Sequence, residues 1–213
     1  MATTTGSRTL IVEKVAIRFA EPFRITNYVF EAMPSILATV DQGQALGRGE
    51  AAGVYYLGDD QERMLETIED VRGEIESGVS RAELQDLLPA CGARNALDCA
   101  LWELDARLEQ RPVWQLAAVP SPRALVTTFT LPADDPAILE TKVKRLSFAK
   151  AIKLKLDGNI DVDCDRISVV RRARPEVWLG VDANQGFAAK DLERLGSAAR
   201  EMAVSLIEQP LKR

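Results

Sequence analysis

The feature that most constrains the fold is a regular alternation of short apolar strands and amphipathic helices over residues 124–207. The pattern predicts strands at 124–131, 151–156, 176–181 and 204–207, with helices at 135–149, 161–174 and 190–202 between them. Strands joined by a helical crossover run parallel, so this part of the chain predicts parallel β/α units. Because a closed barrel needs about eight strands, the pattern fits either a doubly wound sheet or half of a barrel.

The preceding part of the chain has a different pattern, in which strands come first and helices follow. Strands are predicted at 10–19, 35–40 and 46–54, and the segment 21–24 is expected to break the first of them. Helices are predicted at 59–75, 81–88 and 93–109. This order predicts an α+β domain, which we expect to span residues 1–118, with the β/α units in 119–213.

Composition excludes several classes of protein. The 213 residues are 46% hydrophobic and 28% charged with a net charge of −5, which is typical of a globular chain. The chain has no block of basic residues that would indicate nucleic-acid binding, and it has no apolar run long enough to span a membrane. Residues 1–7 lack the apolar segment of a secretory signal. The absence of histidine argues against a structural zinc site. Three widely spaced cysteines, Cys91, Cys99 and Cys164, predict free thiols and a cytoplasmic location.

Two lysines stand on the predicted strand Ile152-Lys153-Leu154-Lys155-Leu156. Alternate residues of a strand share a face, so the two amines point the same way, about 7 Å apart. Burying unpaired ammonium groups is costly, which favours a functional use for them. Lysines that protect an exposed edge strand from aggregation are an equally good explanation of this segment alone.

Carboxylates end the next two predicted strands. Asp182 is followed by the polar turn Ala183-Asn184-Gln185-Gly186, and Glu208 is followed by Gln209-Pro210. Taken singly, Asp182 or Asn184 could cap the turn or the next helix, and Glu208 could be a surface residue. Taken together with the lysines, they lean toward the one rim where active-site groups of parallel barrels gather.

The chemistry of this set is specific. Asp and Glu oxygens are hard ligands that suit Mg²⁺. A metal ion flanked by amines at strand ends forms a site for proton abstraction, because the metal stabilises the developing negative charge while an uncharged lysine takes the proton.

The segments "IKLKLDG", "LGVDANQGF" and "IEQPL" resemble the enolase superfamily, in particular its muconate-lactonising branch. The turn "GRGEAAG" and the helix "ARNALDCALWELDARLEQRPVWQL" are similar to that family's capping domain, so the resemblance spans essentially the whole chain. It implies an α+β capping domain followed by the first half of a TIM-like (β/α) barrel.

The resemblance also implies roles for the residues at the rim. Lys155 matches the catalytic base and Lys153 its electrostatic partner. Asp182 and Glu208 match two of three carboxylate ligands of Mg²⁺, and Asn184 matches a polar position behind them.

Two further residues are implied to meet the substrate. Thr130, in "TTFTL", matches a position that lines the substrate pocket. Arg24 lies in the segment Pro22–Tyr28, which resembles the family's mobile capping loop, and there it could meet a substrate carboxylate. A solvated loop charge is an equally good explanation of Arg24.

The chain departs from the family pattern at its end. A third carboxylate ligand and a second, opposing lysine are expected on later strands, beyond Arg213. We therefore expect the sequence to be a portion of a longer polypeptide.

Within the branch, "EPFRIT" and "TTFTL" beside the lysine pair resemble dipeptide epimerases, which invert the α-carbon of the C-terminal residue of a dipeptide such as Ala-Glu. The partner would be this small carboxylate, and enzymes of the superfamily commonly form oligomers. Muconate cycloisomerase and o-succinylbenzoate synthase activities remain alternatives within the family. An inactive fragment or a non-catalytic binding protein is the alternative from another class.

Overall fold

The computed structural model describes residues 7–212, which form two compact units. One unit holds residues 7–18 together with Ala32–Arg123, and the other holds Phe19–Glu31 together with residues 124–212. The sequence-based boundary after residue 118 lies close to the one after Arg123, but it left residues 19–31 in the first domain.

The sheet of the first unit has the strand order β1-β2-β3. Its strands are β1 (Thr9–Ile25), β2 (Tyr28–Asp41) and β3 (Leu46–Ala51), and β2 pairs antiparallel with β3. The prediction that residues 21–24 break the first strand is wrong, because β1 continues through them and only Thr26 and Asn27 connect it to β2. Proline is tolerated here since β1 is an edge strand, and Asn27, at the second position of the turn, takes a left-handed φ of 63° that asparagine tolerates well.

Helices follow the strands in the first unit, as predicted. They are η1 (Tyr55–Leu57), α1 (Gln61–Asp70), α2 (Arg72–Ser77), α3 (Arg81–Leu87), α4 (Gly92–Leu108) and α5 (Val113–Leu116). The helix predicted at 59–75 is interrupted at Val71, which separates α1 from α2. Asp60 caps α1 through the Arg63 N–H, and Ser80 and Glu83 form a capping box at α3.

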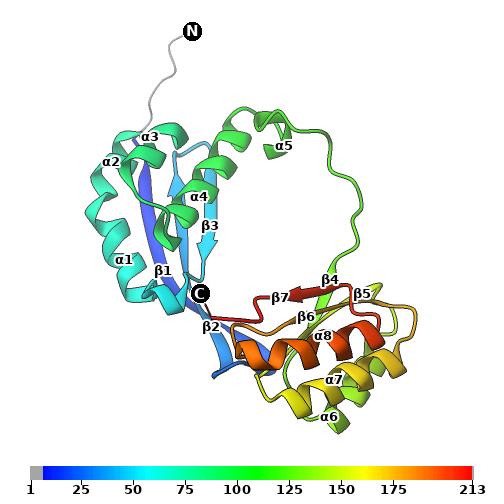
Figure 1. The fold of residues 1–213 in the computed structure, drawn as a ribbon. Helices are drawn as coiled ribbons and strands as arrows, with labels where there is room; N and C mark the ends of the chain where they lie inside the picture. The colour runs from blue at the N-terminus through cyan, green and yellow to red at the C-terminus, as the bar shows by residue number, and fades with distance from the viewer. Residues whose placement is uncertain (1–6, 213) are drawn as a thin grey trace. The chain divides into compact units, whose positions relative to one another are not determined.

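The long helix α4 packs directly on β3 (Figure 1). Glycines on β3 allow this close approach: a Cβ on Gly47 or Gly49 would lie 1.9 Å from a backbone oxygen of α4. The buried stripe of α4 and the inner faces of β2, α1 and α3 form one core, which includes Ile36, Met64, Ile68, Leu84, Leu97 and Leu101.

The second unit is a parallel β/α sheet with the order β4-β5-β6-β7. Its elements are β4 (Thr128–Leu131), α6 (Pro136–Arg145), β5 (Ala151–Lys155), α7 (Ile160–Ala173), β6 (Trp178–Asp182), η2 (Ala189–Asp191), α8 (Leu192–Glu201) and β7 (Leu206–Glu208). Parallel β/α units were predicted, and the structure confirms them.

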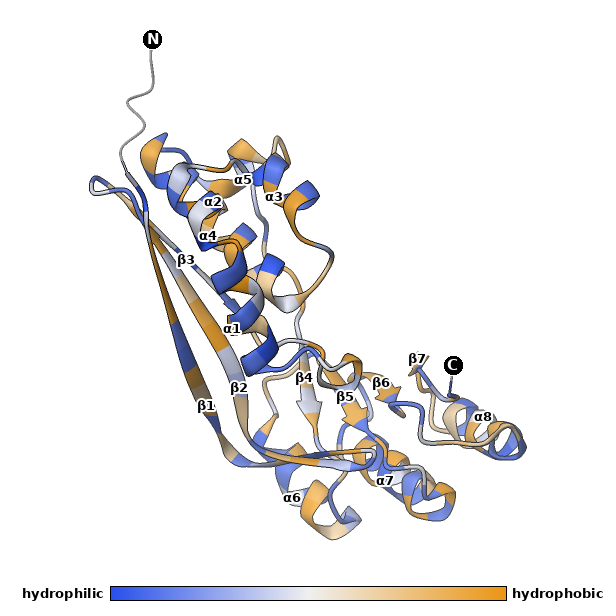
Figure 2. Ribbon diagram, turned by 90° about the vertical axis from the view of Figure 1, so that its left-hand side faces the viewer, coloured by the Kyte–Doolittle hydropathy of each residue, from blue (hydrophilic) through white to orange (hydrophobic). Residues whose placement is uncertain are grey.

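The helices α6, α7 and α8 gather on one face of this sheet (Figure 1). A doubly wound sheet carries helices on both faces, so the arrangement agrees with the first half of a barrel. Hydrophobic and hydrophilic residues alternate along these helices, as the colours of Figure 2 show, and each helix buries apolar residues. The apolar side chains form a second core, which includes Leu139, Val143, Ile152, Leu154, Ile167, Leu179 and Val181.

In the part of the chain that the structure describes, no helix has the length and apolarity needed to cross a membrane. Cys91, Cys99 and Cys164 carry free thiols.

Candidate active site

Three charged residues stand side by side where three neighbouring strands end. Lys155, Asp182 and Glu208 are the last residues of β5, β6 and β7. Lys155 is the register partner of Asp182, and Asp182 is the register partner of Glu208. Because register partners in a parallel sheet point to the same side, the three side chains share one face at the carboxyl edge. We call them the strand-end row.

The middle member of the strand-end row is held by direct contacts. Asp182 is 1% exposed, and its Oδ2 accepts a hydrogen bond of 2.6 Å from Lys155 Nζ. The same amine donates to Asn184 Oδ1 at 3.0 Å. Asn184 has a left-handed φ of 44°, and its N–H donates to Asp182 Oδ1 at 3.0 Å. The turn-capping explanation therefore holds for one oxygen of Asp182, while the other oxygen contacts the lysine.

Lys153 completes a cluster of two amines and two acids. It lies two residues before Lys155, and its Nζ is 3.2 Å from Glu208 Oε2 and 3.7 Å from Asp182 Oδ2. The side chains of Lys153 and Lys155 are 26% and 12% exposed. The explanation of these lysines as protection of an edge strand is wrong, because β5 lies between β4 and β6.

The two proposed substrate-contacting residues lie in the same unit. Thr130 is the register partner of Lys153, so it faces the side of the sheet that carries the lysines. Arg24 is half exposed, and its Nη1 is 3.3 Å from Asp134 Oδ1. The Arg24 carbonyl oxygen also accepts a hydrogen bond of 3.0 Å from the Ala133 N–H, so the tip of the β1–β2 hairpin lies against the end of β4.

A buried arginine that sequence reasoning missed ties two strand-end loops together. Arg166 is 5% exposed, donates to the Asp134 carbonyl and to the Asp163 carboxylate at 2.7 Å each, and forms an ion pair of 2.8 Å with Asp157. Burial raises the pKa of the Asp163 carboxyl, although the hydrogen bond from Arg166 opposes the shift. The spacing of Asp163 and Arg166 on one helix face is the only sequence signal for this group.

A second missed group joins the hairpin to α6. Lys142 donates to Asp134 Oδ2 at 2.6 Å and also pairs with Glu21. Burial alone would lower the pKa of Lys142, but the hydrogen bonds with Asp134 and Glu21 raise it above its ordinary value. The contact with Glu21 links residues more than one hundred positions apart, so no local pattern could reveal it.

The strand-end row has the donor chemistry of a magnesium site. Within the described residues, no group of three or more metal-ligating side chains is gathered. Asp182 and Glu208 nevertheless present carboxylate oxygens from paired positions, and Mg²⁺ is usually bound by one or two carboxylates with water or substrate completing its coordination. The ligand type of these two residues, carboxylate oxygen, therefore suits Mg²⁺.

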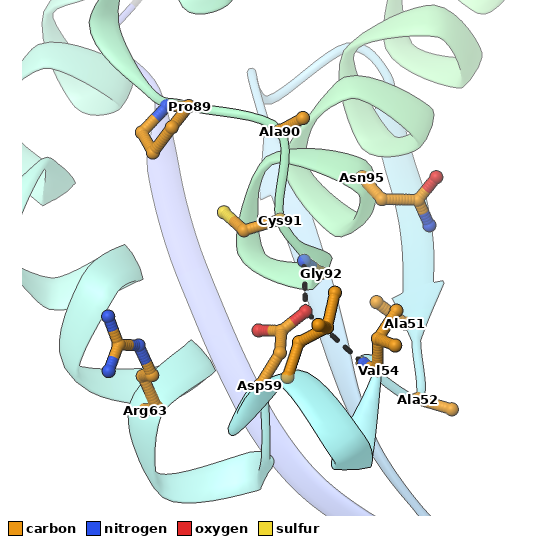
Figure 3. A pocket seen from close by; sticks show the side chains of 12 residues that line it. Ala51, Ala52, Val54, Asp59, Arg63, Pro89, Ala90, Cys91, Gly92 and Asn95 are labelled. Carbon is orange, nitrogen blue, oxygen red and sulfur yellow. Dashed lines mark hydrogen bonds between the residues drawn. The ribbon is translucent and has the colours of Figure 1, made fainter. Parts of the chain in front are cut away.

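The cavity shown in Figure 3 belongs to the first unit and contains none of the strand-end side chains. It has a volume of about 620 Å³ and lies between the segment 51–59 and the start of α4. Its acidic residue, Asp59, accepts hydrogen bonds from the N–H groups of Gly92 at 2.7 Å and Val54 at 3.4 Å. Since these bonds fix the start of α4, we assign Asp59 a structural role.

Two families match the chain. Residues 9–117 match the family described as "Mandelate racemase / muconate lactonizing enzyme, N-terminal domain". Residues 139–213 match the one described as "Enolase C-terminal domain-like".

Curated proteins and solved structures are similar over most of the chain. L-Ala-D/L-Glu epimerase of Escherichia coli (strain K12) is 31% identical over 206 residues, which are 96% of this chain and 64% of that protein. N-acetyl-D-glutamate racemase of Pseudoalteromonas sp is 37% identical over 130 residues, 61% of this chain and 40% of that protein. A dipeptide epimerase from Enterococcus faecalis V583, complexed with Mg and L-Leu-L-Tyr, has a TM-score of 0.86 and 25% identity over 97% of this chain and 62% of its own. The chain thus spans less than two thirds of each relative.

Proposed function

We propose, since this chain belongs to the mandelate racemase / muconate lactonizing enzyme family, that it serves the epimerisation of dipeptides at the α-carbon next to the C-terminal carboxylate. The observation that carries the proposal is the strand-end row, in which one amine and two carboxylates occupy paired positions on adjacent strands. The similarity to an L-Ala-D/L-Glu epimerase and to a dipeptide epimerase supports it.

In this proposal Lys155 is the base that removes the α-proton. Its amine is aimed by Asn184 Oδ1 at 3.0 Å and lies in a mostly buried position, where water competes little for it. Lys153, whose amine is 3.2 Å from Glu208, brings a second positive charge to the face where negative charge develops.

Asp182 and Glu208 would hold Mg²⁺ together with the substrate carboxylate. Bound there, the ion would supply a positive charge that stabilises the negative charge developing on that carboxylate. Asn184 would keep Asp182 in place through its backbone N–H. Inversion also needs a proton donor on the opposite face, and a second lysine beyond Arg213 stays a prediction.

The names of two relatives favour an N-acylated glutamate as substrate. Ala-Glu dipeptides and N-acetylglutamate both carry an acylated α-nitrogen beside an α-carboxylate, and the match to N-acetyl-D-glutamate racemase has the higher identity over its shorter span. Racemisation of N-acylated glutamate is therefore the second candidate function. A cytoplasmic location and an oligomeric state stay predictions.

Proton NMR in D₂O with Mg²⁺ tests the proposal. We expect the α-proton signal of the glutamate in L-Ala-L-Glu to disappear as deuterium replaces it, while removal of Mg²⁺ by a chelator stops the loss. If N-acetyl-L-glutamate exchanges and the dipeptide does not, the second candidate is correct. Turnover of a muconate or a succinylbenzoate precursor with no exchange in either glutamate compound would contradict both. No turnover at all would favour a non-catalytic protein or an inactive fragment.

A further inference from the structure

The turn of the β1–β2 hairpin is fastened to the strands that carry the proposed base and metal ligand. Thr26 is 5% exposed, and its Oγ1 lies 2.7 Å from the carbonyl oxygen of Ala183 and 3.0 Å from that of Leu156. These two residues directly follow Asp182 and Lys155 in the chain. One hydroxyl hydrogen is thus shared between the two carbonyls that end the catalytic segments of β5 and β6.

The Thr26 side chain packs against a glycine in the turn that follows β6. A Cβ on Gly186 would lie 2.9 Å from Thr26 Oγ1 and 3.1 Å from its Cγ2. A Cβ on Gly158, whose φ is +91°, would lie 2.4 Å from the Gly186 carbonyl oxygen. Gly186 therefore admits the Thr26 side chain at a distance that a Cβ would prevent, and Gly158 allows the turn after β5 to approach Gly186.

The hairpin tip is therefore held at the ends of three successive strands. The backbone carbonyl oxygen of Arg24 accepts a hydrogen bond from the N–H of Ala133, which follows β4. The Thr26 hydroxyl contacts the residues that directly follow β5 and β6. The neighbouring Ile25 is also buried. A segment with these contacts keeps a fixed position relative to the strand-end row, whereas the exposed Arg24 side chain stays available to a ligand.

We propose that Thr26 is a positioning residue for the reaction: its hydroxyl anchors the hairpin tip, and the tip holds the substrate beside Lys155. This inference rests on the proposed function. Loss of the hydroxyl releases the tip and leaves the side chains of the base and the metal ligands in place, so it weakens substrate binding more than it slows the chemical step.

Two substitutions separate the hydroxyl from the size of the side chain. Thr26→Val keeps the shape and removes the hydrogen-bond donor, while Thr26→Ser keeps the donor. One neutral hydrogen bond stabilises a contact by about 1 kcal/mol, so we expect Thr26→Val to raise KM about fivefold and to change kcat less than twofold. Thr26→Ser should stay within about twofold of the parent protein in both constants.

A second readout needs no turnover. Trypsin can cleave the folded protein after Arg24 only when the tip opens, and the rate follows the open population. We expect Thr26→Val to accelerate that cleavage about fivefold and Thr26→Ser to leave it unchanged. Cleavage after Arg123, in an exposed segment outside helices and strands, is the internal control and should be equal in all three proteins.

The outcomes are distinct. Equal cleavage after Arg24 in the valine and serine variants would overturn the anchor, even if the parent protein epimerises L-Ala-L-Glu. A difference in cleavage without any dipeptide turnover would reject the proposed function, and the positioning role would fall with it. Faster cleavage together with a raised KM in the valine variant alone is the result that supports the inference.

Discussion

Asp182 and Glu208 are register partners that each end a parallel strand, so their carboxylates start from paired positions at one edge of the sheet. The first is almost fully buried, while the side chain of the second is 39% exposed. A buried carboxylate beside a more accessible one gives a metal ion a fixed ligand and an open side for substrate.

Replacing Asp182, the proposed buried ligand, should therefore weaken Mg²⁺ binding. We expect Asp182→Asn, which keeps the shape and removes the charge, to raise the Kd for Mg²⁺ at least about tenfold in isothermal titration calorimetry. Asp165→Asn, on the exposed face of α7, removes the same charge and should leave the Kd unchanged. Equal Mg²⁺ affinity in both variants would show that Asp182 is not a ligand.

The exposed arginine of the hairpin tip should bind the substrate. If Arg24 contacts a substrate carboxylate, Arg24→Met should raise KM for L-Ala-L-Glu about tenfold or more, because hydrogen bonds to charged groups contribute about 1.5–3 kcal/mol. The exposed Arg18→Met is the control for loss of a positive charge on the same strand. An unchanged KM in steady-state kinetics would leave Arg24 with only its pairing to Asp134.

Two glycines of the chain should respond in opposite ways to alanine. Gly158→Ala places a Cβ 2.4 Å from a backbone oxygen at a φ of +91°, so we expect it to lower the free energy of unfolding by more than about 1 kcal/mol. Gly73→Ala lies within α2 in open space and should raise that free energy by about 0.5–1 kcal/mol. Urea denaturation measures both, and a neutral Gly158→Ala would contradict the close contact.

The first unit contains a carboxylate whose contribution to stability depends on pH. Partial burial alone would raise the pKa of Glu103, but hydrogen bonds from the Arg48 N–H and the Arg107 side chain hold it below its ordinary value of 4.5. Because the folded state lowers this pKa, the stabilisation is present above pH 4.5 and is lost as the pH falls through the lowered value.

We therefore expect Glu103→Gln to lower the free energy of unfolding at pH 7 by up to about 1 kcal/mol, given its partial exposure. The difference in free energy of unfolding between the variant and the parent protein should become smaller as the pH falls below 4.5. The exposed Glu66→Gln is the control, and denaturation curves at several pH values are the measurement. A gap that stays constant down to pH 3 would contradict the lowered pKa.

The sequence predicted most of the fold because local periodicity determined it. The alternation of strand and helix after residue 124 identified each parallel strand, and strand periodicity placed Lys153 and Lys155 on one face. The break expected at Pro22 failed because proline costs little on an edge strand, which local sequence does not reveal. The choice between half a barrel and a doubly wound sheet needed the structure, since it depends on which face the helices cover.

The contacts around the strand-end row could be predicted only in part. Asp182 and Glu208 follow apolar strands, which is a local signal, and the resemblance gave their order. Thr26 meets carbonyls 130 and 157 residues later, and such pairings leave no trace in the spacing of a single sequence. Arg166 likewise joins loops whose proximity exists only after folding.

The most direct test of the account is α-proton exchange by the Lys155→Ala variant. In D₂O with Mg²⁺ and L-Ala-L-Glu, we predict that the exchange rate falls by about 10²- to 10⁴-fold while the circular dichroism spectrum is retained. The exposed Lys150→Ala, just before the same strand, should exchange at the parent rate. A folded Lys155→Ala protein that exchanges the α-proton as fast as the parent would contradict the assignment of Lys155 as the base.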